Sequence, residues 1–595
     1  MIYLSILVFF LTIDQVSRFI QWKISDRNET IVGYSFLIII TNFLSVTLNL
    51  FSKNIFIFLF ISLIVLIFIN QNLKKNNNNG SYLFFFSAFI IVILPVIFSN
   101  YNFFVFRGNW WDHFNYISGV LALKYSTVET IRENGEIQQL IGWWGNISVS
   151  HRPSVVIMNS TFSLGVDIYK ESYLFLAAYI GLLNVEIGKW NISKNIYYNL
   201  IFSLAISFGF WGQYVFDISA WSHLACLPIY FCIVRLILTD KGSNFQILVL
   251  LAAAFIVYQE ATIYLIIVFG ISFLLQKIHQ KKLLTLIPIT VVAVSISIID
   301  YEGAFSRIFS FLMPREVAEG LSQTGILYFG QVFFGYDFTS NFYDQISNIK
   351  NLIMKDGIIE VFYFLTKENL SYILLPLNIF PILIGNYFII EKFSFSILIE
   401  TLVSFLVTIT FAIYYFKKWN DPENKLILNI FVVFSVLFLY FLMNKQYWEM
   451  FKSGSYIFPI ITVLIVKKIS EETIISAKLI LSFFLVSNLG FIVERGVLSW
   501  NSNGIGHSYP FPSVLRYEHK MNADYQYDIL ANNCRFVFID ESNFNKKHFL
   551  LNLSQIHGPK KIINDLEKYV KAETCIYRFK KSNEKEFVEI ISSEA

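Results

Sequence analysis

The chain has 595 residues, of which 55% are hydrophobic and only 15% are charged, well below the roughly 25% charged residues of soluble domains. This composition excludes an ordinary soluble enzyme, and the many apolar runs of about 20 residues are typical of a helical protein that crosses a membrane repeatedly. The net charge of +4 is spread over short loops, which argues against a nucleic-acid-binding surface.

Hydrophobic segments run in chain order through residues 1–495 and predict an all-α polytopic membrane domain with about 13 to 15 spans. The predicted spans are 1–20, 31–51, 54–71, 82–100, 172–187, 198–216, 219–238, 245–258, 261–276, 283–300, 371–390, 393–416, 425–443, 455–466 and 476–493. Segment 371–390 contains Pro376 and Pro381, which break helical hydrogen bonding, so we expect it to re-enter the membrane without crossing it.

Basic connectors predict the orientation of these spans. If each early span crosses once, one side carries Lys74, Lys75, Lys189, Lys194, Lys241 and the cluster 277–282. By the positive-inside rule this side is the cytoplasm, together with Lys467 and Lys468 later in the chain. The same alternation places the connections 101–171 and 301–370 outside. The short loop 444–454 is also outside if segment 371–390 does not cross the membrane.

Residues 496–595 predict a small soluble α/β domain, because they carry 25 of the 88 charged residues in the chain. If segment 371–390 does not cross, this domain is extracytoplasmic, whereas a full crossing would place it in the cytoplasm. We expect a helix at Pro559–Tyr569 and a disulfide between Cys534 and Cys575, which only an oxidising compartment permits. The bias towards Phe, Ile, Asn and Lys is typical of AT-rich coding and favours a bacterium.

Asp112 is the most informative residue for function. It follows a stretch almost free of acids, directly after Trp110 and Trp111, and it precedes residues 114–125, whose apolar spacing predicts a helix lying on the membrane surface. Desolvation raises the proton affinity of such a carboxylate, which suits it to act as a general base. The alternative is that Asp112 only caps the following helix.

Other polar residues on the predicted outer side are candidates for binding substrate. Arg152 could neutralise a phosphate, or it could be a solvated arginine. Asp217 could ligate a metal or hold an acceptor sugar, although an acid at that position also caps the next helix. Glu260 lies at the tip of a tight hairpin, where it could simply reach headgroup water.

Two later segments add weaker candidates. Arg315 follows a proline in the long connection 301–370. Lys452 precedes Ser453, Gly454, Ser455 and Tyr456, a combination that would suit a phosphate at a helix mouth. A lysine reaching the membrane surface is the simpler interpretation of Lys452.

The order of parts resembles the GT-C superfamily of membrane glycosyltransferases, in which an outward loop with an acid is followed by a surface helix and many spans. The sequence resemblance is confined to Trp111–Asp112–His113 and the region Lys452–Tyr456. It implies that Asp112 is the general base, with Trp111 and His113 beside it in the substrate site, and that the donor is a sugar on polyprenyl phosphate. About three spans precede the Asp112 loop where that superfamily usually has one, and no second acid accompanies Asp112.

These features predict an inverting glycosyltransferase of the bacterial inner membrane, acting at the outer face on a lipid-phosphate donor and a glycan or lipid-linked acceptor. The sequence leaves the cofactor open, including whether a divalent cation takes part. A surface-polysaccharide polymerase is the alternative enzyme, and a polysaccharide or lipid flippase is the alternative from another class. Walker-type phosphate loops, HExxH, GxSxG and CxxC motifs are absent, which argues against ATP-driven transport, zinc proteolysis, serine hydrolysis and thiol redox chemistry.

Overall fold

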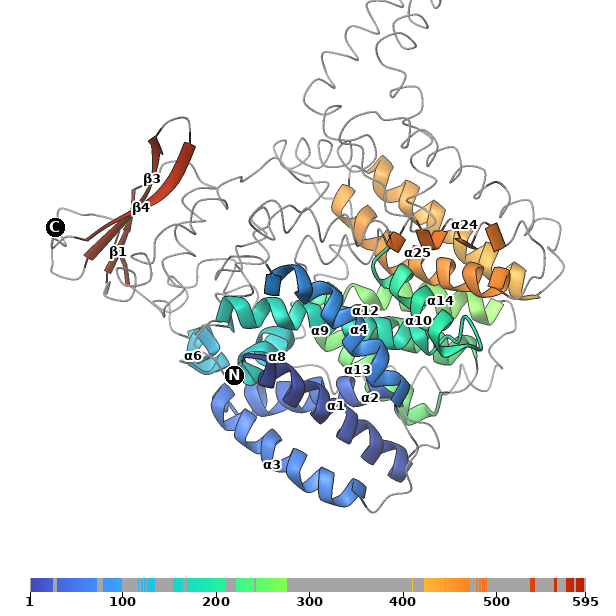
Figure 1. Ribbon diagram of the computed structural model, residues 1–595, viewed down its shortest axis with the longest axis horizontal. Helices are drawn as coiled ribbons and strands as arrows, with labels where there is room; N and C mark the ends of the chain where they lie inside the picture. The colour runs from blue at the N-terminus through green and yellow to red at the C-terminus, as the bar shows by residue number, and fades with distance from the viewer. Residues whose placement is uncertain are drawn as a thin grey trace, which may run out of the picture.

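The protein is described by a computed structural model (Figure 1). The described residues are 2–24, 29–71, 79–98, 116, 119–120, 122–124, 126–133, 153–163, 168–209, 221–239, 242–274, 409, 422–444, 446–470, 478–479, 481–482, 484–486, 488–489, 536–540, 561–563, 574–582 and 585–592. The predicted spans 283–300, 371–390 and 393–416 therefore lie almost entirely outside the part of the chain that is described, and so does the connection 301–370.

Most of the described chain is helical. The helices are α1 (Ile2–Ile24), α2 (Thr30–Asn42) with its π-helical continuation η1 (Phe43–Thr47), α3 (Ser52–Gln71), α4 (Asn79–Phe98), α6 (Val128–Glu133), α8 (Pro153–Phe162), α9 (Ile168–Gly188), α10 (Ile196–Ser207), α12 (Trp221–Leu238), α13 (Asn244–Val257), α14 (Ala261–Leu274), α24 (Pro422–Met443) and α25 (Tyr447–Ser470). Those that fall on predicted spans confirm that these segments are helical, with shifts of a few residues at most ends and larger ones for α10 and α25.

Within the described ranges, five helical segments are long and apolar enough to cross a membrane, namely Leu4–Trp22, Thr30–Thr47, Ser52–Gln71, Trp221–Leu238 and Lys452–Ser470. Six shorter apolar helices accompany them among the described residues. This pattern indicates a helical membrane protein. Helix α12 lies inside the bundle, where 94% of its apolar segment is buried, whereas α3 lies at the margin with 22% buried (Figure 1).

Small residues allow several helices to approach closely. A Cβ atom added to Gly33 on α2 would lie 2.5 Å from the backbone oxygen of Ile13 and 2.8 Å from Ser17, both on α1. Gly181 and Gly188 on α9 face the rings of Phe85 and Phe84 on α4 in the same way. Such positions let backbones pack closely, as is common between membrane helices.

Helix α8 shows that the connection 101–171, which is predicted to lie on the outer side of the membrane, contains a segment that packs inside the bundle. All residues from Ser154 to Phe162 are buried, and α8 contacts α2, α3 and α13. Its ten residues extend for only about 15 Å, half of a bilayer core. Its polar side chains find partners inside the protein: the Ser154 hydroxyl donates to the Ile256 carbonyl, and Tyr179 donates to Asn159 Oδ1. Hydropathy alone missed this segment because those polar residues interrupt its apolar run.

Helix α25 begins at Tyr447, so most of the predicted outer loop 444–454 is helical, and the prediction of a loop there is wrong. The hydroxyls of Ser453 and Ser455 donate to the carbonyls of Glu449 and Lys452. These hydrogen bonds to carbonyls of the same helix satisfy the serine hydroxyls, so residues that usually favour turns can lie within a helix.

The C-terminal segment contains a four-stranded sheet of β1 (Phe536–Ile539), β2 (Lys561–Ile563), β3 (Thr574–Ser582) and β4 (Lys585–Ser592) in the order β2-β1-β3-β4. Strand β1 is parallel to β2 and β3, and β4 is antiparallel to β3. The predicted helix at Pro559–Tyr569 is wrong at Lys561–Ile563. These residues pair with Phe536–Phe538, and the β-branched Ile562 and Ile563 favour a strand.

Cys575 on β3 is disulfide-bonded, whereas Cys226 and Cys232 are free thiols. The chain has four cysteines, so the remaining one, Cys534, is the only partner that Cys575 can have within the chain. Cys534 itself lies outside the described residues. Cys575 therefore takes part in a disulfide, and its pairing with Cys534 stays a prediction.

Candidate functional site

Contacts between helix termini define two ends of the bundle. At the ion-pair end, named for Glu29, Glu186, Lys189 and Arg235, the start of α2 meets the ends of α9 and α12. The start of α4 joins them through the hydroxyls of Ser81 and Thr30, which are 3.1 Å apart. The end of α25 joins through Ser470, which donates to the Ile192 carbonyl. The connectors that were predicted to share the cytoplasmic side, from their basic residues, therefore lie at the same end of the bundle.

The opposite end, the aromatic end, is named for Tyr116, Trp221, His223, Tyr258, Tyr264 and Tyr456. Here the starts of α12, α14 and α25 meet. Of the predicted site residues, Glu260, Lys452 and Tyr456 are described, and all three belong to this end. Six others lie outside the described residues: Trp111, Asp112, His113, Arg152, Asp217 and Arg315.

Tyr456 is the centre of the aromatic end. Its ring lies 4.6 Å from the ring of His223 and 4.9 Å from that of Tyr264, with near-parallel planes. The Tyr230 ring meets it edge-on at 4.8 Å. The Tyr456 side chain is fully buried, so we expect it to shape a site and not to touch a substrate itself.

At the aromatic end, polar contacts hold α25 against α12 and α14. Ser455 Oγ lies 2.7 Å from Nε2 of His223 on α12, and Ser453 Oγ lies 2.8 Å from the hydroxyl of Tyr264 on α14. Gly454 lies between the two serines, and short side chains there let α25 approach both neighbours. The half-buried Lys452 lies one residue before this contact.

The helix predicted after Asp112 docks onto the same end. Tyr116 is four residues after Asp112, and its hydroxyl donates to Ser222 Oγ at 2.9 Å. Its ring stacks on Trp221 with centroids 5.2 Å apart. The described residues of 116–124 are helical, and Tyr116, Val120 and Leu123 are buried at the expected helical spacing. Its apolar face therefore packs against protein.

Glu260 and the described segment that follows Arg152 belong to the same end. Ser154, two residues after Arg152, donates to the carbonyl of Ile256 near the end of α13. The chain then turns through Tyr258, whose ring lies 5.1 Å from that of His223, and reaches Glu260. Glu260 is only 5% exposed, which argues against the alternative that it simply reaches headgroup water at the tip of a hairpin.

The ion-pair end was not predicted from the sequence. Arg235 on α12 donates from Nε to Glu186 Oε1 at 2.5 Å and from Nη2 to Glu29 Oε2 at 2.7 Å. Lys189 Nζ lies 3.0 Å from the same oxygen of Glu29. Two cations and two carboxylates therefore balance one another in a buried network. Arg235, a lone arginine in an apolar helix, could have indicated such a network, because a buried charge requires partners of opposite charge.

Burial alone would raise the pKa of Glu29, but the adjacent Lys189 and Arg235 outweigh it and lower this pKa from 4.5 to about 2. Glu29 is therefore a stable anion at any physiological pH. A group held so firmly in one protonation state is poorly suited to proton transfer near neutral pH.

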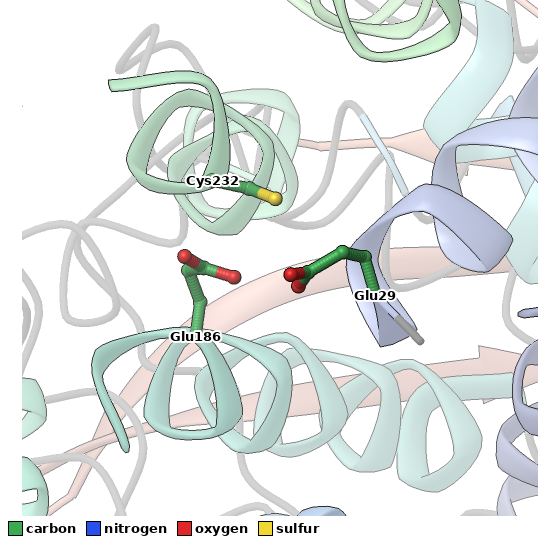
Figure 2. A group of neighbouring side chains, drawn as sticks. All are labelled: Glu29, Glu186 and Cys232. Carbon is green, nitrogen blue, oxygen red and sulfur yellow. The ribbon is translucent and has the colours of Figure 1, made fainter. Parts of the chain in front are cut away.

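Glu29, Glu186 and Cys232 also have the composition of a metal site. Figure 2 shows the two carboxylates and the thiol turned towards one another. One possible ligand atom from each of the three lies within 4.8 Å of the others. However, the guanidinium of Arg235 bonds both carboxylates and lies 3.7 Å from Cys232 Sγ. A metal ion would have to displace this cation and would meet the positive charge of Lys189. The residues therefore do not fit a metal centre.

The buried Asp14 forms a second ion pair, with the partly exposed Arg18, next to this network. Its Oδ2 accepts from Arg18 Nε at 2.8 Å and from the Tyr82 hydroxyl at 2.7 Å. Tyr82 follows Ser81, which contacts Thr30, so the pair belongs to the ion-pair end. Asn70 near the end of α3 donates to Gln15, the neighbour of Asp14. This network attaches the marginal helix α3 to the bundle.

Comparison with known proteins adds no relative, since no protein family matches the chain and no curated protein matches it significantly.

Proposed function

We propose that the chain is an inverting glycosyltransferase that moves a sugar from a polyprenyl-phosphate donor to a glycan or lipid-linked acceptor. The observation that carries this proposal is the convergence at the aromatic end. Tyr116, which follows the Asp112 loop, docks at the start of α12, and α12 contacts α25 next to Lys452. The resemblance to GT-C glycosyltransferases rests on these same two regions of the sequence.

Asp112 would accept the proton of the acceptor hydroxyl. The acceptor oxygen bonds to the anomeric carbon, the bond from that carbon to the phosphate oxygen breaks, and polyprenyl phosphate leaves. Arg152 and Lys452 would offset the negative charge on the departing phosphate, because fixed cations stabilise charge that develops in a transition state. Buried rings around Tyr456 would keep the walls of this end rigid.

The proposed location is a bacterial inner membrane with the aromatic end outside. Two observations support this orientation. Lys189, Lys194, Lys467 and Lys468 lie at or beside helix termini of the ion-pair end, which the positive-inside rule places in the cytoplasm. The disulfide of Cys575 suits an oxidising compartment, and we propose that the C-terminal sheet lies there.

Purified protein in lipid nanodiscs, incubated with radiolabelled polyprenyl-phosphate sugars and bacterial membrane glycolipids, tests the proposal. We expect label to move to the glycolipid fraction and Asp112→Asn to lower the rate by at least about a hundredfold. Glu129→Gln is the matched control, because Glu129 is an exposed acid of the same connection 101–171 and accepts from Asn49. Full transfer by Asp112→Asn would contradict the proposal, and dependence on arginines alone would favour a polymerase.

A further inference from the structure

The tripeptide Trp221–Ser222–His223 at the start of α12 contacts two segments that are far apart in the sequence. On one side, Trp221 stacks on Tyr116, and Ser222 accepts from the Tyr116 hydroxyl. On the other side, His223 contacts Ser455 and stacks on Tyr456 of α25. One helical turn therefore joins the chain just after Asp112 to the helix that carries Lys452.

Hydrogen-bond accounting indicates the direction of the contact between His223 and Ser455. The single hydroxyl proton of Ser455 is donated to the Lys452 carbonyl at 2.7 Å. Nε2 of His223, also 2.7 Å from Ser455 Oγ, is therefore the donor in the second bond. His223 is buried, and its ring also stacks on Tyr258, so its orientation is set from several sides.

We propose that His223 is a positioning residue, which through Ser455 sets α12 and the attached Asp112 loop against α25. This inference rests on the proposed function, because it assigns Asp112 and Lys452 to opposite reacting groups. A shift of about 1 Å between such groups can cost about a hundredfold in rate. His223 acts through the position of Asp112 and does not exchange a proton with the substrate.

Two substitutions separate the hydrogen bond from the ring contacts. His223→Gln places an amide donor near the position of Nε2 and keeps the bond to Ser455, whereas His223→Phe keeps a ring that stacks on Tyr456 and loses the bond. We expect His223→Phe to lower kcat by about tenfold to a hundredfold with little change in KM. His223→Gln should restore most of this loss.

Ser455→Ala removes the same bond from the other side and should match His223→Phe. The double variant should be no slower than either single variant, because both changes break one contact. Ser62→Ala is the control, since the Ser62 hydroxyl bonds only within α3, to the Phe58 carbonyl, on a marginal helix. Equal losses of kcat in His223→Gln and His223→Phe would overturn the proposed role of the hydrogen bond.

A readout without substrate separates this inference from the proposed function. A cysteine is placed at Asp112, and its rate of modification by a membrane-impermeant maleimide is measured with His223, His223→Gln and His223→Phe. We expect the rate to change about threefold or more with His223→Phe and to stay constant with His223→Gln. Equal rates in all three proteins would overturn the positioning role, whereas absence of sugar transfer alongside altered labelling would reject only the proposed function.

Discussion

The two ends of the bundle use polar groups in opposite ways. At the ion-pair end, four charged side chains from three segments pair with one another, and Arg235 satisfies two carboxylates at once. At the aromatic end, tyrosines, serines and one histidine join three helices through ring contacts and hydrogen bonds to serine hydroxyls. Predicted site residues gather only at the aromatic end among the residues that the structure describes.

This difference separates a structural role from a chemical one. Charges buried in a low dielectric persist when each has a partner, and such a closed network has no group available for a substrate. The aromatic end has a different character, since the segments that follow Asp112 and Arg152 both dock there. We therefore expect substitutions at the ion-pair end to change stability and substitutions at the aromatic end to change activity.

The largest effect on stability should come from Arg235→Met, which leaves two buried carboxylates without their main partner. Removing one member of a buried ion pair costs about 3 to 5 kcal/mol of unfolding free energy. Denaturation in mixed detergent micelles measures this loss. Lys189→Met is the matched control, because Lys189 is 20% exposed and bonds one carboxylate, so its loss should cost about 1 kcal/mol or less. Equal effects would mean that the network is not organised by Arg235.

Gly33→Ala should have the next largest effect, because it forces α2 away from α1 one turn beyond Glu29. The new methyl group would meet backbone atoms of Ile13 and Ser17, and overpacking of this kind costs about 1 to 3 kcal/mol. Gly270→Ala on α14 is the control, since nothing lies within 4 Å of its Cβ position. That variant should be as stable as the wild type or more stable. A neutral Gly33→Ala would show that packing at the ion-pair end is loose.

A smaller difference in unfolding free energy should separate the substitutions of two tyrosines, one from each end of the bundle. Tyr82→Phe removes a donor to the Asp14 carboxylate, and bonds to charged groups are worth about 1.5 to 3 kcal/mol, with the low end expected for a half-buried residue. Tyr264→Phe removes a bond to the neutral Ser453 hydroxyl, worth about 0.5 to 1.5 kcal/mol. The same denaturation measurement compares them. A larger loss in Tyr264→Phe would reverse the proposed difference between the ends.

Near neutral pH, the smallest effect should be that of a change in pH on the contribution of Glu29 to stability. Its pKa is lower in the folded protein, about 2, than the ordinary 4.5. Its contribution is therefore complete above pH 4.5 and is lost as the pH falls towards 2. The stability difference between wild type and Glu29→Gln should stay constant at neutral pH and shrink only below pH 4.5. A change near pH 7 would show that Glu29 exchanges protons there.

Apolar periodicity predicted most described helices because burial in lipid depends on local composition. It missed α8, whose polar residues are satisfied by distant partners, and it misplaced the start of α25, whose serines bond their own helix. The ion-pair network could not be derived, since Arg235 and Glu29 are 206 residues apart. The candidate site was predicted as separate segments, and only the fold shows that Tyr116, His223 and Tyr456 meet.

The most direct test compares one substitution at each end in the same nanodisc preparations. Asp112→Asn should lower sugar transfer by at least about a hundredfold with an unchanged thermal unfolding midpoint. Glu186→Gln should lower the midpoint, because it weakens the pairing of Arg235, while each folded molecule transfers sugar at the wild-type rate. The opposite pattern, with transfer lost in folded Glu186→Gln and kept in Asp112→Asn, would contradict the assignment of chemistry to the aromatic end.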